Sequence, residues 1–306
     1  MPRVRAFAPG GIGNLGPGLD IFGCAVAGEG DAVIAERASG AGVRIARSGH
    51  PDLPTDATRH ASGIAAAEVL RVIGAGASGV VLEVEKGLPL ASGQGGSAAS
   101  AVAGAAAVNA LFGGQLDPTQ LLAAALAAES VVAGRHADNV AAALYGGIVL
   151  IRSLEPLEVV RLPVPAGIRI VLVHPHHRLS TADARRVLPH TIDRATAIHQ
   201  AAQVAAVVTA LHSGDLALLG RAIEDRIAEP ARAPLLPGFL AAKAAAIEAG
   251  ALACSISGAG PSAFALCADD GTGAQVGEAM RRAYAAAGVE SDARVTGVDT
   301  VGVRLT

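Results

Sequence analysis

A glycine-rich loop that leads into an alanine-rich helix constrains this chain more than any other feature. Residues 86–100 read KGLPLASGQGGSAAS: a Pro-containing turn, then Gly93, Gly95 and Gly96, then Ser97 at the start of a long alanine-rich run. Backbone N–H groups of such a loop can converge on one point, and the following helix directs the positive end of its dipole there. The pattern predicts a phosphate-binding loop, and therefore a nucleotide or another phosphorylated ligand.

Two other kinds of phosphate loop do not fit the sequence. A Walker-type loop needs GxxxxGK followed by Ser or Thr, and neither Lys86 nor Lys243, the only lysines, stands in that context. A GxGxxG fingerprint does occur at residues 11–16, but Pro17 and Gly18 interrupt the helix that it must open. Backbone amides, the helix dipole and the serine, rather than a lysine, are therefore expected to bind the phosphate.

Composition narrows the class of ligand and the cellular setting. Among 306 residues, hydrophobic residues make up 51%, aromatic residues only 2%, and the net charge is -3. Neither a basic surface nor a stacking platform is indicated, so we expect no nucleic acid and no membrane as partner. The sequence shows no signal-peptide apolar region, and the cysteines lack metal or redox spacing, so a cytoplasmic protein with buried thiols is predicted. The cysteines are Cys24, Cys254 and Cys267.

The order of predicted elements favours two α+β lobes over regular βαβ alternation. The first half predicts strands at 3–8, 22–27, 32–37, 43–47, 79–85 and 146–151, and helices at 60–73, 97–111 and 117–132. The second half predicts strands at 168–174, 253–257, 263–266 and 297–304, and helices at 181–187, 192–212, 216–227, 240–249 and 277–287.

Glu129 is the one acid in the apolar run LLAAALAAESVVAG. On a helix it shares a face with Leu122, Ala125 and Leu126, and a carboxylate buried there needs a cation. A magnesium ion shared with Ser97 and nucleotide phosphates would provide one. The alternative is a carboxylate near the helix end that reaches water.

Three further polar segments have a functional and a plain structural interpretation. The burst RHADN at residues 135–139 is a turn between apolar segments, or a set of substrate contacts. The loop SGAGPS at residues 257–262 is a hairpin turn, or backbone packed under the phosphate loop. The run HPHH at residues 174–177 is better explained as a loop at a strand end than as a metal site. No GxSxG elbow supports a serine hydrolase.

Six segments in register resemble the GHMP kinase family, and within it the members that phosphorylate L-homoserine. They are APGGIGNLGPGLDIFG, PLASGQGGSAASAVA, AAESVVAGRHADNVAAALYGG, LSTADARRVLP, RIAEPARAPLLPGF and SISGAGPSAFAL. The resemblance implies an α+β, two-lobed GHMP kinase fold, with an N-terminal lobe like domain 2 of ribosomal protein S5 and a ferredoxin-like C-terminal lobe. Residues 1–155 would form the ATP-binding lobe with the phosphate loop, and residues 156–306 would complete the substrate site.

The resemblance also implies a reaction: Mg²⁺-dependent transfer of a phosphoryl group from ATP to L-homoserine, giving O-phospho-L-homoserine for threonine biosynthesis. A homodimer is one assembly that the resemblance allows. The implied magnesium ligands are Ser97 and Glu129, which with Asn139 form the catalytic set. The implied ATP-binding residues are Pro89, Leu90, Ala91, Ser92, Gly93, Gln94, Gly95, Gly96, Ser97, Ala98 and Ala99. The implied substrate residues are Asn14, Asp20, His136, Asn139, Arg185 and Arg232.

The chemistry of these residue types agrees with an amino-acid substrate. Asp20 suits an ammonium group, and the guanidinium forks of Arg185 and Arg232 suit a carboxylate. Other members of the family carry an aspartate base near Asn139, whose amide cannot take a proton. Catalysis is therefore expected to rest on positioning and charge stabilisation, which phosphoryl transfer tolerates.

The chain departs from the family pattern at five positions. Gln94 replaces a leucine, Gly96 a serine, Leu19 a phenylalanine, Ala142 a proline and Ala231 an aromatic residue. Two of the changes fall in the phosphate loop, and two could enlarge the substrate pocket. A kinase for another small alcohol, or a catalytically weakened homologue that binds ligand as a sensor, are the alternatives that these departures leave.

Overall fold

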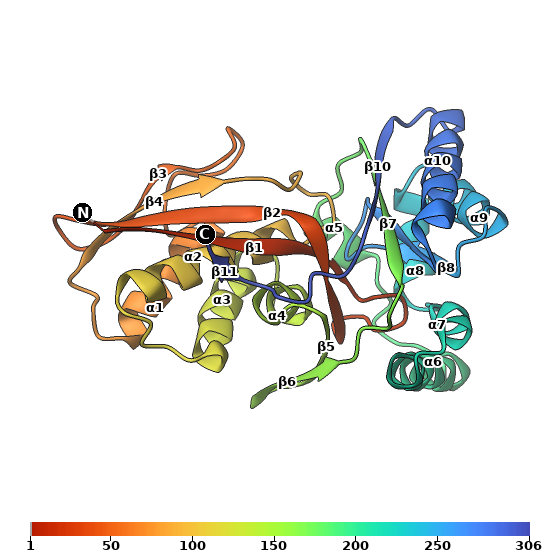
Figure 1. Cartoon of the computed structure of the whole chain (residues 1–306), viewed down its shortest axis with the longest axis horizontal. Coiled ribbons are helices and arrows are strands. Elements are labelled where there is room, and N and C mark those ends of the chain that lie inside the picture. Colours follow the sequence, from red (N-terminus) through yellow and green to blue (C-terminus); the bar gives the residue numbers. More distant parts are fainter. Residues whose placement is uncertain (1) are drawn as a thin grey trace.

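Two β-sheets with separate helical layers form the molecule, which was analysed as a computed structural model describing residues 2–306 (Figure 1). The larger sheet has strand order β11-β1-β2-β4-β3, with β5 paired to β2 and β6 paired to β5. The smaller sheet has the order β10-β7-β9-β8. This two-lobed α+β architecture is the predicted fold class. No helix among the described residues is long and apolar enough to cross a membrane.

The larger sheet takes strands from both ends of the sequence. Its strands are β1 (Arg3–Gly13), β2 (Phe22–Ala38), β3 (Gly42–Arg47), β4 (Gly79–Glu85), β5 (Ile148–Leu154), β6 (Leu157–Leu162) and β11 (Arg304–Leu305). Strand β11 pairs with β1, so the C-terminus returns to the N-terminal lobe (Figure 1). The predicted boundary between residues 155 and 156 stays a prediction, and it lies inside the β5–β6 hairpin.

Four helices pack on one face of this sheet: α1 (Ala61–Val72), α2 (Gly96–Leu111), α3 (Pro118–Val132) and α4 (Asp138–Tyr145). Helix α2 lies in the middle of the layer and is buried on nearly every side. Its small residues permit this, because a Cβ added at Gly104 would lie 2.8 Å from the carbonyl oxygen of Ser62 in α1. The predicted start of α3 is confirmed: Asp117 and Gln120 form a reciprocal capping box.

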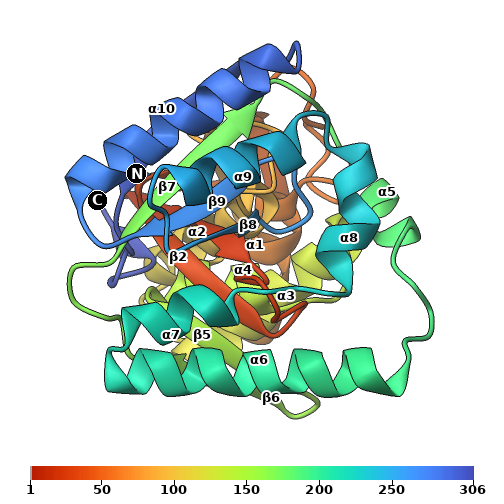
Figure 2. The same cartoon turned by 90° about the vertical axis from the view of Figure 1, so that its right-hand side faces the viewer.

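The smaller sheet separates two apolar layers. Its strands are β7 (Arg169–Pro175), β8 (Ala253–Ile256), β9 (Ala263–Cys267) and β10 (Ser291–Thr296). Side chains of β7 alternate: Val171 and Val173 face α9 (Phe239–Glu248) and α10 (Asp270–Ala286), which cover the outer side (Figure 2). Ile170 and Leu172 face the other way, into a core shared with β1, β2 and the helices α6 (Arg194–Ser213) and α7 (Leu216–Ala222). The short helices α5 (Thr181–Arg186) and α8 (Ala228–Arg232) border the site.

Several predicted elements were wrong in extent. The strands expected at 22–27 and 32–37 form one strand, β2. It pairs with β1 along its length, both before and after a register shift between Pro9 and Gly11. The helix expected at 216–227 ends at Ala222. The strand expected at 297–304 is replaced by β10 and the two-residue β11, and the last helix begins at Asp270, where Asp269 caps it. Helix α4 was missed, since its first turn lies in the polar burst that was also explained as a turn.

Candidate active site

A cavity of about 320 Å³ lies where the phosphate loop meets elements of both halves of the chain. Residues of the turn after β1, the loop before α2, the end of α3 and the start of α4 line one part. Residues of α5, α8 and the 257–262 loop line the rest. The GxGxxG segment at residues 11–16 opens no helix, as predicted. Residues 11–13 end strand β1, and residues 14–20 form turns.

The phosphate loop has the backbone geometry that binding an anion requires. Gly93 and Gly95 adopt left-handed conformations with φ of 78° and 70°, which glycine reaches without strain. Gly95 is the N-cap of α2, and no side chain caps the helix there. The first N–H groups of α2 are therefore left without a side-chain acceptor at a helix N-terminus beside the cavity, where an anion is stabilised.

The 257–262 loop packs directly against the phosphate loop, as one of its two interpretations predicted. Ser257 Oγ donates a hydrogen bond to the carbonyl oxygen of Gly93 at 2.8 Å, and the amide of Ser262 donates to the carbonyl oxygen of Ser92 at 3.0 Å. A Cβ added at Gly93 would lie 2.4 Å from the carbonyl oxygen of Ser257. Glycine at this position is therefore required by contact as well as by conformation.

Ser97 and Glu129 come together at the end of the phosphate loop. Ser97 Oγ donates to Glu129 Oε1 at 3.0 Å, and Glu129 Oε2 is buried without a hydrogen-bond partner. Burial raises the pKa of the Glu129 carboxyl to about 7, although the charge of His136 and the hydrogen bond from Ser97 lower it. A hydroxyl and a carboxylate with a vacant oxygen beside a phosphate loop are the hard oxygen donors that Mg²⁺ binds, so these residues fit the ion.

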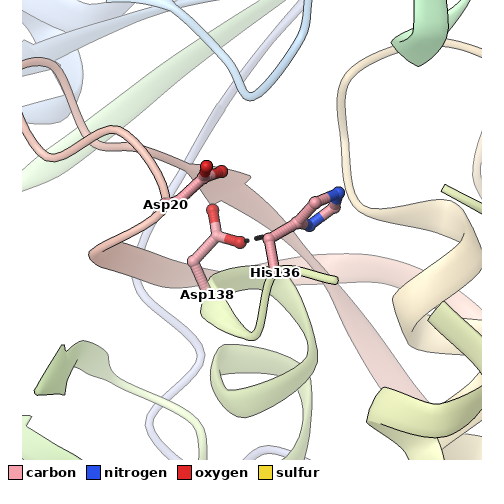
Figure 3. A group of neighbouring side chains, drawn as sticks. All are labelled: Asp20, His136 and Asp138. Atoms are coloured by element: carbon pink, nitrogen blue, oxygen red, sulfur yellow. Dashed lines mark ion pairs between the residues drawn. The ribbon is translucent and has the colours of Figure 1, made fainter. Parts of the chain in front are cut away.

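Three ionisable side chains gather at the start of α4: Asp20, His136 and Asp138 (Figure 3). One ligand atom from each lies within 4.8 Å of the others, and His136 Nδ1 is 3.6 Å from Asp138 Oδ1. Burial opposes the charged form of His136, but Asp138 and Glu129 outweigh it and raise its pKa. Two neighbouring carboxylates favour a cation between them. This group lines the cavity, and its two carboxylates suit an ammonium group.

The two predicted carboxylate-binding arginines are adjacent. Arg185 forms a bidentate pair with Asp20, at 3.2 and 2.5 Å. Arg232 is buried and donates to the carbonyl oxygens of Ala184 and Gly258 at 3.1 and 2.9 Å. Among the described residues, no acid lies within ion-pair distance of Arg232. Burial, and then the charge of Arg185, lowers the pKa of Arg232, so an anion bound here would relieve two close positive charges.

Most of the predicted site residues line the one cavity. The substrate set does so completely: Asn14, Asp20, His136, Asn139, Arg185 and Arg232. Eight of the predicted ATP-binding residues do so as well: Pro89, Leu90, Ala91, Ser92, Gly93, Gly95, Gly96 and Ser97. Gln94, Ala98 and Ala99 are buried and absent from its lining, so their side chains do not face the ligand space. Leu19 and Ala231 are also absent from it, which gives no support to an enlarged substrate pocket.

Asp138 and Lys86 line the cavity but were not among the site residues that the sequence predicted. Asp138 is almost fully buried, and its Oδ1 has no hydrogen-bond partner. Lys86 reaches into the phosphate loop, where its Nζ donates to the carbonyl oxygen of Gly96 at 3.2 Å and forms a buried ion pair with Asp31. A cation therefore adjoins the loop, but its charge is paired with Asp31, and phosphate binding by backbone amides and the helix dipole stays a prediction. The one sequence signal that could have pointed to Lys86 is that lysine is rare in this chain.

Comparison with known proteins agrees with this fold. The family model described as the GHMP kinases N terminal domain matches residues 60–147, and the model described as GHMP kinases C terminal matches residues 207–286. The first match contains the phosphate loop, Glu129 and Asn139. Fold and site thus define a small-molecule kinase with a phosphate loop at a helix N-terminus. The chain belongs to the GHMP kinase family.

Relatives with the same name cover almost the whole chain. Homoserine kinase of Arabidopsis thaliana is 43% identical, over 99% of this chain and 84% of the relative. Homoserine kinase of Chlorobium phaeobacteroides is 44% identical, over 93% of this chain and 92% of the relative. The solved structure of homoserine kinase from Cytophaga hutchinsonii superposes with a TM-score of 0.96 at 41% identity, over 100% of this chain and 98% of that one.

Proposed function

We propose that this protein phosphorylates L-homoserine: it transfers the γ-phosphoryl group of ATP to the side-chain hydroxyl and forms O-phospho-L-homoserine. The observation that carries the proposal is one cavity with a phosphate loop at one end and a charge set for an α-amino acid at the other. The full-length similarity to proteins named homoserine kinase supports the same substrate.

The amino-acid end would bind a zwitterion by exchanging partners. Asp20 and Arg185 form an ion pair and neutralise each other. A substrate ammonium group would pair with Asp20, assisted by Asp138, and its carboxylate would pair with Arg185 and Arg232. Each charge exposed when the Asp20–Arg185 pair separates thus gains a new partner. A sugar or a simple alcohol offers neither charge and would leave the pair intact.

Asn139 would align the hydroxyl with the phosphate loop. Its Oδ1 is buried without a hydrogen-bond partner and lies 3.0 Å from where a Cβ at Gly95 would be. The side chain therefore lies beside the phosphate loop, where it would reach the hydroxyl of a bound substrate. Its amide can orient a hydroxyl but cannot accept a proton, so positioning and charge stabilisation carry the rate enhancement.

Magnesium would be held by Ser97 and Glu129, and when bound it neutralises charge on the phosphates of ATP. We include ATP and Mg²⁺ as reactants in the proposal, together with a place in threonine biosynthesis and in the cytoplasm. The three cysteines, buried and without disulfides, agree with a reducing compartment. A homodimer stays a prediction.

A coupled assay of ADP release tests the proposal. Purified protein with Mg-ATP is given L-homoserine, mevalonate, shikimate or sugars, and turnover on homoserine is expected to exceed the others at least a hundredfold. Asp20→Asn should raise the KM for homoserine roughly tenfold to a hundredfold, since it weakens a charge-assisted contact, and leave the KM for ATP unchanged. Asp193→Asn, on the exposed cap of α6, is the matched control and should change neither constant.

Two outcomes would count against the proposal. Faster turnover on another alcohol than on homoserine would indicate a kinase for that other small alcohol. Binding of ATP without turnover on any alcohol would favour a sensor.

A further inference from the structure

Gln94 stands inside the phosphate loop, yet its side chain turns away from the ligand space. It is 3% exposed and absent from the lining of the cavity, unlike its neighbours Gly93 and Gly95. A buried amide needs partners for its donor and acceptor groups. Those partners show what this residue does.

Both ends of the Gln94 amide are hydrogen-bonded to the C-terminal lobe. Its Nε2 donates to Ser262 Oγ at 3.2 Å, and its Oε1 accepts from Arg294 Nη2 at 3.2 Å. Arg294 lies on β10, the edge strand of the smaller sheet, and Ser262 immediately precedes β9. The backbone carbonyl of Gln94 accepts from the amide of Gly11 in β1 at 3.0 Å. One residue of the loop is thus fixed to both sheets.

Arg294 also contacts the larger sheet. Its Nη1 pairs with Glu29 Oε2 on β2 at 3.0 Å, and its side chain is 23% exposed. The guanidinium therefore joins the two lobes at one point and holds the phosphate loop at another. Its planar fork suits two simultaneous acceptors. The Glu29 contact lies outside the phosphate loop and gives a built-in comparison.

A leucine, the residue usual in the family pattern, would not make the contacts of Gln94 in this chain. It would remove the partner of Arg294 Nη2 and one of the two side-chain partners of Ser262 Oγ, the other being His174 Nδ1, and the loss of buried polar partners is costly. We propose that Gln94 is a positioning residue: through Arg294 and Ser262 it fixes the phosphate loop to the C-terminal lobe and so sets the affinity for nucleotide phosphates. This rests on the proposed function only in taking the loop as the nucleotide site.

Calorimetric titration with Mg-ADP, without homoserine, tests the proposal. Gln94→Met keeps the side-chain volume and removes both polar groups, and Arg294→Met removes the partner. Each variant is expected to weaken Mg-ADP binding about fivefold. The double variant should bind no more weakly than the single variant with the lower affinity, because both substitutions break the same interaction.

The Glu29→Gln control breaks the other contact of Arg294, and its affinity for Mg-ADP should stay within about twofold of the wild type. Effects of Gln94→Met and Arg294→Met that multiply in the double variant would overturn the proposal, as would equal weakening by Glu29→Gln or unchanged binding in Gln94→Met. A Gln94→Met protein that does not fold leaves the test to Arg294→Met, where unchanged binding, or a loss that Glu29→Gln matches, overturns the proposal. Failure of the wild type to turn over homoserine would sink the proposed function alone.

Discussion

At the scale of single residues, the site contains buried charged groups without protein partners. Glu129 Oε2 and Asp138 Oδ1 have no hydrogen-bond partner, and Arg232 has no acidic partner among the described residues. Buried charges without partners destabilise a fold, so such residues are kept where a ligand supplies the missing charge. Mg²⁺ and a zwitterionic substrate would supply these charges together.

Glu129→Gln should stabilise the Mg²⁺-free protein at high pH while abolishing Mg²⁺-dependent turnover. The pKa of Glu129 is raised from 4.5 to about 7, so the folded state binds a proton more tightly than the unfolded state. The protonated acid is fully present below pH 4.5, and its favourable contribution is lost as the pH rises through 7. Glutamine mimics the protonated acid, so at pH 8 the variant should gain at most about 3 kcal/mol in free energy of unfolding.

Urea unfolding at pH 4.5 and pH 8 measures this difference. The gain should nearly vanish at the lower pH, and Glu248→Gln, at the exposed end of α9, should show no gain at either. An equal gain at both values of pH would mean that burial does not raise the pKa of the Glu129 carboxyl. Full Mg²⁺-dependent activity of Glu129→Gln would remove this residue from the metal site.

The sequence predicted those site residues whose role is marked by their immediate sequence neighbours, and missed those whose role depends on distant contacts. Glu129 could be found because it is the one acid in an apolar helical run, and Ser97 because it opens the helix after the glycines. Asp138 was passed over because a dense polar segment does not show which of its members turns inward. Lys86 could not be placed, because its position depends on the pairing of β2 with β4, which brings Asp31 beside it.

At the scale of elements, the phosphate loop and the 257–262 loop act as one unit. The Ser257 hydroxyl and the Ser262 amide donate hydrogen bonds to carbonyl oxygens of the phosphate loop and so join the two loops. The sequence predicted this packing only as one of two interpretations, since contact between segments about 165 residues apart has no local signal. The errors in β2 and β10 have the same cause, because pairing with a distant strand decides where a strand begins and ends.

Gly93→Ala should abolish nucleotide binding. Alanine at this position would have both the left-handed φ of 78° and a Cβ 2.4 Å from the carbonyl oxygen of Ser257, so the two loops must separate. Gly214→Ala is the matched control: its φ is 72°, but nothing lies within 4 Å of the added Cβ. The control should lose only about 1 to 2 kcal/mol of stability and keep its affinity for Mg-ADP. Retained affinity in Gly93→Ala would show that the loops need not touch.

At the scale of the whole molecule, the two lobes are parts of one structure rather than independent units. Ile12 and Phe22 from the larger sheet share a buried cluster with Ile170, Phe264 and Leu266 from the smaller one. Strand β11 returns from the C-terminal half to pair with β1. Separation of the lobes would expose this shared core, so folding is expected to be cooperative across both.

The two tyrosines allow that cooperativity to be measured, because there is no tryptophan and each lobe holds one tyrosine. Tyr145 ends α4 in the N-terminal lobe, and Tyr284 is buried under the smaller sheet on α10. Tyr145→Phe and Tyr284→Phe each leave one reporter, and the denaturation midpoint from tyrosine fluorescence should coincide with that from circular dichroism in both. Separate midpoints for the two reporters, in variants of equal total stability, would show that the lobes unfold independently. The substrate cavity, which takes residues from both lobes, would then be lost at the lower midpoint; with a single transition it persists until the whole chain unfolds.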